Sequence, residues 1–242
     1  MKVAIMQPYF LPYIGYWQML AAVDRFVLLD DVAFIPRGWI HRNRLLVQGR
    51  VHPFTLPVSG GSQNRAIDVV ERFEPAIWSA RFRKTVVQEY RRAAHFDETM
   101  ALLDPILNDM RGNLASFLAS SITAVRQHLG IDTPVVSAAA RHPSRGLKAA
   151  ERIIDICERE GATEYINSPG GAALYDPAEF ARHGIALHFI EPVPVPYPQP
   201  GTGFVAALSI LDVLMRAGSE RARAMLPSCR IRAAAAATQA DA

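Results

Sequence analysis

Two short apolar segments near the N-terminus, each followed directly by polar side chains, constrain the fold of this chain most strongly. Residues 2–6 (KVAIM) precede Gln7, and residues 25–30 (RFVLLD) end at the first member of the acidic pair Asp30-Asp31. Short runs rich in Val, Leu and Ile are typical of strands buried on both faces of a parallel sheet. Residues 13–22 between them predict a helix, so the chain begins as a βαβ unit. Polar groups beyond the carboxyl ends of such strands mark the expected ligand site.

The rest of the chain alternates strand and helix patterns around a helical middle. Residues 43–48 and 51–58 predict a hairpin that turns at Gly49. Apolar residues at helical spacing predict a set of helices, the first of which opens at Pro75. Further strands and helices are predicted at residues 97–110, 113–129, 133–138, 147–160, 164–167, 185–190 and 203–217.

These patterns predict an α/β fold with an open, mostly parallel sheet of the Rossmann-like, nucleotidyltransferase type, and with a helical insertion. Residues 1–74 and 131–230 form the predicted α/β domain, and residues 75–130 form the helical insertion or lobe. The Ala-rich tail, residues 231–242, is predicted to be disordered.

Composition narrows the class of protein. Hydrophobic residues make up 50% of the chain and charged residues 20%, which is typical of a soluble globular protein. The net charge of +3 is too small to indicate nucleic-acid binding, but arginines cluster between Arg37 and Arg50, which suits a phosphate or carboxylate ligand. The two cysteines, Cys157 and Cys229, form no framework of pairs, which fits a reducing compartment. The N-terminus shows no signal-peptide pattern, so we expect a cytoplasmic protein with no membrane partner.

Four residues around the first predicted turn are candidates for substrate binding: Gln7, Tyr9, Tyr13 and Gly15. Gln7 stands at a strand tip and can both donate and accept hydrogen bonds. Gly15 permits close approach to the start of the helix, whose free N–H groups favour an anion. The alternative is a rigid turn whose aromatic rings pack on the core.

The acidic pair Asp30-Asp31 is the first candidate for catalysis. Paired carboxylates at a strand tip can hold Mg²⁺, orient an amine or a sugar hydroxyl, or pair with arginine. Because side chains alternate along a strand, one of the two is expected to point inward. The alternative is a solvated strand end or an ion pair with a nearby arginine.

The segment RGWIHRNR is the most polar candidate. If it is extended, Trp39, His41 and Asn43 share one face. Arg37, Arg44 and Trp39 are candidates for binding a phosphate and stacking a ring, whereas His41 and Asn43 are candidate catalytic residues, His41 as a general base. The alternative is a charged hairpin edge that prevents aggregation.

Two later strand-to-loop junctions supply weaker candidates. Arg145 and Lys148 flank the start of a predicted helix, where they would reach a phosphate, and Asn167 and Gly171 belong to a Gly-rich loop that permits close approach. The motifs GxGxxG, GxxxxGK[ST], HExxH, GxSxG and CxxC are absent, and the 7 histidines show no metal spacing. No metal site is predicted, and Cys157 is expected to be buried in a helix rather than nucleophilic.

Six segments of the chain resemble the WbqC-like family: MQPYFLPYIGYWQML, DRFVLLDDV, GWIHRNR, YINSPGGAALYD, HGIALHFI and FVAALSILDVLM. The resemblance spans residues 2–226 except for a variable middle. The family is associated with bacterial surface-polysaccharide gene clusters, and the addition of an amino acid such as glycine to an amino sugar has been proposed for it. The resemblance implies site roles for Gln7, Tyr9, Tyr13, Gly15, Asp30, Asp31, Trp39, Asn43, Arg44, Asn167 and Gly171.

A second, more distant likeness is architectural. The opening strand, turn, helix and strand resemble the nucleotidyltransferases with a HIGH-type motif, among them pantothenate synthetase, which activate a carboxylate as an adenylate and pass it to an amine. This chain has aromatic and Pro residues around Gly15 in place of the HxGH histidines. If the fold is shared, Arg37, Arg44 or Arg145 would have to contact the phosphates instead.

Three interpretations of the function follow. The leading one is a biosynthetic transferase or ligase that forms an amide between an amino acid or acyl group and a small amine, with ATP and Mg²⁺ as expected cofactors of an adenylation step. The second is an acyltransferase that takes a preactivated donor, such as a charged tRNA. The third is a non-catalytic protein that binds a sugar nucleotide or scaffolds a biosynthetic complex.

Overall fold

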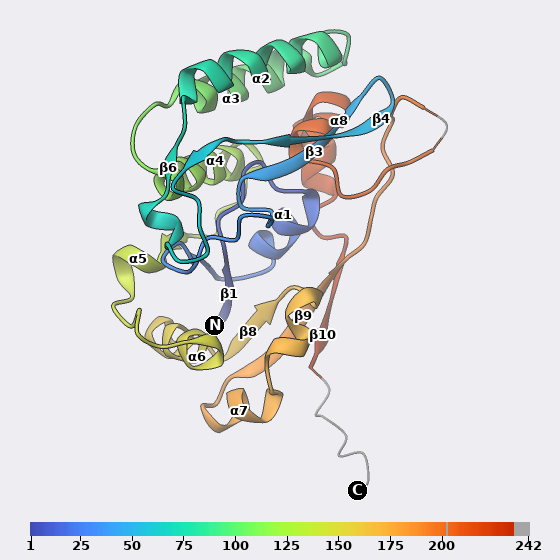
Figure 1. Ribbon diagram of the computed structural model, residues 1–242. Helices are drawn as coiled ribbons and strands as arrows, with labels where there is room; N and C mark the ends of the chain where they lie inside the picture. The colour runs from blue at the N-terminus through green and yellow to red at the C-terminus, as the bar shows by residue number, and fades with distance from the viewer. Residues whose placement is uncertain (202, 235–242) are drawn as a thin grey trace, which may run out of the picture.

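The computed structural model describes residues 1–201 and 203–234, and it places a six-stranded sheet at the centre of the molecule (Figure 1). In sheet order the strands are β10 (Cys229–Ala233), β9 (Ala186–Pro192), β8 (Glu164–Asn167), β1 (Lys2–Met6), β2 (Arg25–Leu28) and β7 (Val135–Ser137). Neighbouring strands pair in parallel, except that β10 runs antiparallel to β9. The predicted α/β fold with an open, mostly parallel, Rossmann-like sheet is confirmed.

The chain fills the sheet outward from β1 in two directions. β1 is followed by β2 and then β7 on one side, after which the chain returns to β8 on the other side of β1 and continues to β9 and β10. The strand order therefore reverses between β1 and β8. In an open α/β sheet, a crevice beyond the carboxyl ends of the strands at this switch point is the usual ligand site.

Helices cover both faces of the sheet because side chains alternate along each strand. Val3 and Ile5 of β1 pack with α6 and α7 in a smaller apolar core, whereas Ala4 belongs to a larger core with α1, α2, α3, α4 and α8. The bounds are α1 (Ile14–Ala21), α2 (Pro75–Tyr90), α3 (Phe96–Asn108), α4 (Leu114–His128), α5 (Ala138–Arg141), α6 (Ala149–Glu160), α7 (Pro177–Arg182) and α8 (Ile210–Ala224). Short 3₁₀ segments lie at Ile67–Val69 and Pro169–Leu174.

Along the chain, α2, α3 and α4 follow β2 and precede β7, where an insertion was expected. Figure 1 shows α2 and α3 side by side at the top of the molecule. Pro75 lies in the first turn of α2, as predicted. The Asn113 side chain caps α4, since its Oδ1 accepts a hydrogen bond from the Ser116 N–H at 2.9 Å. Buried side chains of these helices, including Phe82 and Phe117, share the larger core with the sheet.

The predicted hairpin is formed by β3 (Arg42–Val47) and β4 (Arg50–Thr55), and a smaller pair is formed by β5 (Val58–Ser59) and β6 (Glu71–Arg72). Gln48 and Gly49 both have positive φ angles, of 50° and 74°, which suits a two-residue hairpin turn.

The condition under which Trp39, His41 and Asn43 would share one face is not met, because residues 37–41 form turns and β3 begins only at Arg42. The Gly38 N–H donates to the Ile35 carbonyl at 2.9 Å, and the Arg42 N–H donates to the Trp39 carbonyl at 3.2 Å. These two local hydrogen bonds fold the segment back on itself, so Trp39 does not share a strand face with Asn43.

The C-terminal elements also differ from the prediction. The helix expected at 203–217 is α8, which begins at Ile210 because Ser209 caps it, its Oγ accepting from the Leu211 N–H at 3.3 Å. Residues 231–233 of the predicted tail belong to β10, whose backbone pairs with β9. The remainder of that tail, residues 235–242, lies outside the described residues. Within the described ranges, none of the helices combines the length and apolar character needed to cross a bilayer.

Candidate functional site

A cavity of about 370 Å³ lies at the switch point, beyond the carboxyl ends of β1, β8 and β9. Five of the predicted site residues line it: Gln7, Tyr9, Tyr13, Gly15 and Trp39. The side chains that complete the walls are mainly apolar, and no lining residue carries a charge. We call this the switch-point cavity; it is suited to a ligand with a ring or another apolar face.

Aromatic rings form one side of the switch-point cavity. The Tyr9 ring centroid lies 6.3 Å from that of Tyr16 and 6.3 Å from that of Trp39. Trp39 is 54% exposed, so its indole is available at the rim. Burial raises the pKa values of the Tyr9, Tyr13 and Tyr16 hydroxyls, although the Arg44 charge opposes this for Tyr9. These hydroxyls therefore stay protonated at neutral pH and can donate hydrogen bonds.

Gly15 is required by the close packing of the cavity wall. A Cβ atom at this position would lie 2.7 Å from Cγ of Pro192 and 2.8 Å from Cζ of Tyr13. Both distances are shorter than carbon atoms tolerate, so the glycine lets the Tyr13 ring and Pro192 meet over the start of α1. The close approach predicted for Gly15 is thus to the protein's own side chains.

A second hollow of about 320 Å³ adjoins the first and shares Gln7 and Ser168 with it. Asn167 and Gly171 line this second hollow. The Asn167 Oδ1 accepts from the Ser168 N–H at 2.7 Å, and a Cβ on Gly171 would lie 2.9 Å from the Asn167 Cγ. The structure therefore brings Gln7, Asn167 and Gly171 together around this second hollow.

Asn43 lies beneath the turn rather than in the cavity. Its buried Nδ2 donates to the carbonyls of Phe10 (3.1 Å) and Leu11 (2.5 Å), and its Oδ1 accepts from the Arg44 N–H. Leu11 has a left-handed φ of 46°, a conformation that is costly for a residue with a side chain. Asn43 thus holds the turn that forms the cavity wall.

His41 is also buried, and it packs against Phe34 with 4.9 Å between the ring centroids. Its Nδ1 has no hydrogen-bond partner among the described residues. Burial, and secondarily the charge of Arg42, lowers the pKa of His41, so the ring is neutral at neutral pH. The ring lies outside the switch-point cavity.

Arg44 lies at the edge of the cavity. Its guanidinium carbon is 5.4 Å from the centre of the Trp39 ring, and its Nη2 donates to the Ala207 carbonyl at 3.0 Å. Its Nε is buried without a hydrogen-bond partner among the described residues, and no carboxylate there forms an ion pair with it. Arg44 is therefore a positive charge with a free donor, beside an aromatic wall.

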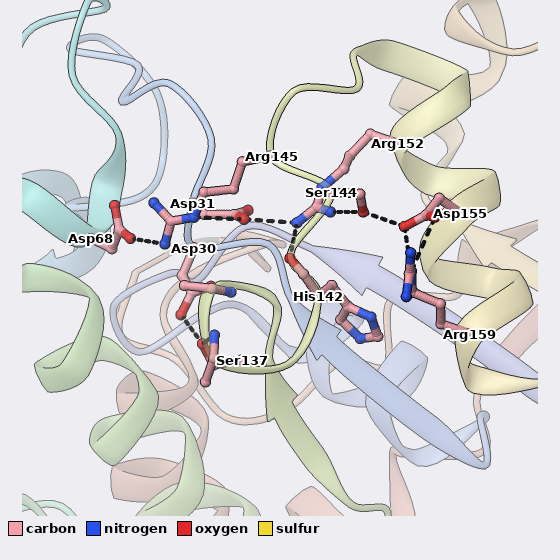
Figure 2. A network of polar contacts seen from close by, with 12 residues as sticks. Asp30, Asp31, Asp68, Ser137, His142, Ser144, Arg145, Arg152, Asp155 and Arg159 are labelled. Atoms are coloured by element: carbon pink, nitrogen blue, oxygen red, sulfur yellow. Dashed lines mark hydrogen bonds and ion pairs between the residues drawn. The ribbon is translucent and has the colours of Figure 1, made fainter.

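Asp30 and Asp31 lie in a separate polar network, which Figure 2 shows from close by. The Asp30 carboxylate accepts from the Ser137 hydroxyl at 2.5 Å and from the Ala139 N–H at 2.9 Å. Asp31 accepts from Arg152 Nη2 at 2.7 Å, and Arg145 Nε lies 3.6 Å from it. Both carboxylates are buried, whereas only one was expected to point inward.

The network continues to both sides of the acidic pair (Figure 2). Arg145 pairs with Asp68 at 2.6 Å, and its hydrogen bond to this carboxylate, together with the negative charge, raises the pKa of the guanidinium. Ser144 links Arg152 to Asp155. Arg145 is therefore engaged by carboxylates, while the side chains of Arg37 and Lys148 are exposed and lie outside the switch-point cavity.

The acidic pair is arranged to accept hydrogen bonds from arginine, serine and a backbone N–H rather than to bind a metal cation. Each carboxylate already accepts hydrogen bonds from the protein. In the part of the chain that the structure describes, no group of three or more His, Cys, Asp or Glu side chains is placed to bind a metal ion. This donor set does not fit the Mg²⁺ that the sequence suggested.

Four residues of the site and its surroundings were not predicted from the sequence: Tyr16, Ser168, Pro192 and Arg152. The first two are sequence neighbours of predicted residues, and strand-end position could have identified Ser168. Arg152 follows Lys148 by one helical turn and shares a helix face with the buried Ile156, a placement that marks an arginine turned toward the protein interior.

Comparison with known proteins identifies the family of this chain. The WbqC-like protein family model matches residues 7–224. The chain is 29% identical over 221 residues to the uncharacterized protein Rv1507c of Mycobacterium tuberculosis, an alignment that covers 90% of this chain and 95% of that protein. No solved structure matches the chain. The matched region contains the turn, the acidic pair, the RGWIHRNR segment and both strand tips, and the chain belongs to the WbqC-like protein family.

Proposed function

We propose that this protein forms an amide on the amino group of a small, ring-bearing substrate, such as an amino sugar or its nucleotide, bound in the switch-point cavity. The observation that carries the proposal is the aromatic lining of this cavity at the reversal of strand order. Tyr9 and Trp39 offer ring faces to a sugar or a base, and Gln7 and Ser168 offer hydrogen bonds that would orient it.

Two routes to the amide remain to be distinguished by experiment. In the first, a carboxylate oxygen attacks the α-phosphorus of ATP and pyrophosphate leaves. The amine nitrogen then attacks the acyl carbon, the bond from that carbon to the phosphate oxygen breaks, AMP leaves, and the nitrogen loses a proton. The positive charge of Arg44, which has no carboxylate partner among the described residues, supports an anionic intermediate at this site.

In the second route, the same nitrogen attacks a donor that is already activated, such as a charged tRNA, and the carrier leaves. The observation that favours this route is that Arg145 and Arg152 are already paired with carboxylates, which leaves fewer cations for a triphosphate. A Gly-rich phosphate-binding loop is also absent from the sequence.

The test is to incubate the full chain with amino sugars, amino-sugar nucleotides and amino acids, with ATP in one arm and a preactivated donor in the other. Pyrophosphate release and the product mass are measured in each arm. Trp39→Ala should raise the KM for the amine, whereas Phe73→Ala removes a ring of similar exposure outside the cavity and should not. Absence of an amide product in both arms would overturn the proposal.

A further inference from the structure

A second apolar cavity, separate from the site described above, lies under the Pro-rich segment that follows β9. Its volume is about 200 Å³, and its lining includes Ile14, Val195, Phe204 and Leu208. Among the described residues, no charged side chain lines it. We call it the strap cavity, because the strap, residues 193–201 and 203–208, contributes most of its lining.

The strap is held in place by its own hydrogen bonds. The Tyr197 hydroxyl donates to Oδ2 of Asp212 at 2.7 Å, and this fully buried carboxylate also accepts from Tyr90 at 2.6 Å. The Gln199 side chain donates to the carbonyl of Val205 and accepts from its N–H. The strap cavity is therefore formed before any ligand arrives, which lowers the entropic cost of binding.

The strap cavity and the switch-point cavity share two wall residues, Tyr13 and Pro192. Arg44 contacts residues of both cavities, since its guanidinium lies over Trp39 of the first and donates to the carbonyl of Ala207 in the second. Among the described residues no carboxylate pairs with the Arg44 guanidinium, although a buried charge is normally compensated. An anion that reaches this guanidinium between Trp39 and Ala207 would supply the missing negative charge.

We propose that the strap cavity binds the apolar side chain of the carboxylic acid that is joined to the amine, while Arg44 holds the carboxylate. This inference rests on the proposed function and names its donor class. A cavity of about 150 Å³ lined by apolar side chains stays dry and binds benzene. The strap cavity is slightly larger, so it suits a ring or branched chain of about six carbons and favours such acids over glycine.

The binding test uses the full chain without ATP or amine, titrated with acetate, butanoate, hexanoate and the neutral hexanamide. Affinity should rise about fourfold for each methylene that enters the cavity. Hexanamide should bind about tenfold or more weakly than hexanoate, because it lacks the charge that Arg44 recognises. Equal affinity for acetate and hexanoate, or no binding of any carboxylate, would overturn the inference.

Two substitutions locate the binding. Ala206 is exposed and lines the strap cavity, so Ala206→Leu should fill the cavity and weaken hexanoate binding about tenfold while leaving acetate binding unchanged. Ala80→Leu places a leucine side chain on the exposed surface of α2 instead and should change neither hexanoate binding nor acetate binding. Arg44→Met should abolish the preference for hexanoate over hexanamide. If Ala206→Leu binds hexanoate as the parent chain does, the inference is wrong.

The outcomes also separate this inference from the proposed function. A chain that binds hexanoate in the expected way but forms no amide in either donor arm would overturn the proposed function alone. The donor class alone would be overturned by two results together. The chain would form amides from glycine and from six-carbon acids with equal kcat/KM, and Ala206→Leu would leave these two kcat/KM values equal.

Discussion

Arg152 donates a 2.7 Å hydrogen bond to Oδ2 of Asp31, and the two side chains are only 4% and 1% exposed. This ion pair joins the end of β2 to the first turn of α6, two elements that lie far apart in the sequence. Removing one partner of such a pair leaves the other charge buried without compensation.

Arg152→Met should therefore lower the free energy of unfolding by about 3–5 kcal/mol, measured by urea denaturation. Arg83→Met breaks an exposed pair with Asp104 and should leave the midpoint nearly unchanged. Equal midpoints for Arg152→Met and the parent chain would contradict the structural role that we assign to this pair.

Asn43 provides the second prediction. Asn43→Ala leaves the Phe10 carbonyl without its donor, which should cost about 1–3 kcal/mol in the free energy of unfolding. Asn43→Asp should cost more, because it also faces two carbonyl oxygens with a buried charge. Thermal and urea unfolding of both variants measure this, with Asn64→Ala on the exposed loop as the control. A stable, inactive Asn43→Asp would instead indicate a direct role in chemistry.

The sequence predicted the fold because its signals are local. Short apolar runs, Pro75 at a helix start and Gly49 in a hairpin turn each specify their own element, and alternating strands and helices then permit few topologies. The strand tips at Gln7 and Asn167 were identified for the same reason. The fold places both beside the reversal of strand order, where the cavities lie.

The sequence could not predict which residues far apart in the chain form ion pairs or strand pairs. Asp31 follows the apolar run of β2, and Arg44 directly precedes the apolar run of β3. Asp31 is nevertheless paired with Arg152, whereas Arg44 has no carboxylate partner among the described residues. Which partner each meets depends on α6 and on the strap. For the same reason β10 was missed, since an edge strand of alternating Arg and apolar residues is defined by its pairing with β9.

His41 gives a pH-dependence. Its pKa is lowered in the folded chain by burial, whereas an unfolded histidine titrates near about 6.5. Below about pH 6.5 the unfolded state binds the proton and the folded state does not. The free energy of unfolding is therefore highest above this pH and falls as the pH decreases.

We expect His41→Phe to lose less stability than the parent chain between about pH 7.5 and 5.5, measured by urea unfolding. The free energy of unfolding of the variant should still decrease somewhat toward low pH, because burial also lowers the pKa values of His128 and His142. The same substitution at the exposed His52 serves as the control. Parallel pH profiles for His41→Phe and the parent chain would show that His41 does not resist protonation.

Cys157 should be inert in the native protein. Burial in α6 raises the pKa of its thiol to about 12, so the thiolate is scarce and inaccessible at neutral pH. Iodoacetamide labelling followed by mass spectrometry should modify Cys157 only after denaturation. The Cys229→Ser variant, which leaves Cys157 as the single cysteine, should therefore stay unlabelled in native buffer. Rapid native labelling of that variant would contradict the packing of α6.

Gly15→Ala tests the wall that joins the two cavities. In an exposed helix, alanine is favoured over glycine by about 1 kcal/mol. At Gly15 the added Cβ would meet Pro192 and Tyr13 at 2.7 and 2.8 Å, so both side chains must move. We expect lower thermal stability and weaker binding of ring-bearing amines. Gly146→Ala adds a Cβ with no atom within 4 Å and should leave both properties unchanged. If Gly15→Ala binds these amines as tightly as the parent chain, ligand binding does not depend on this wall.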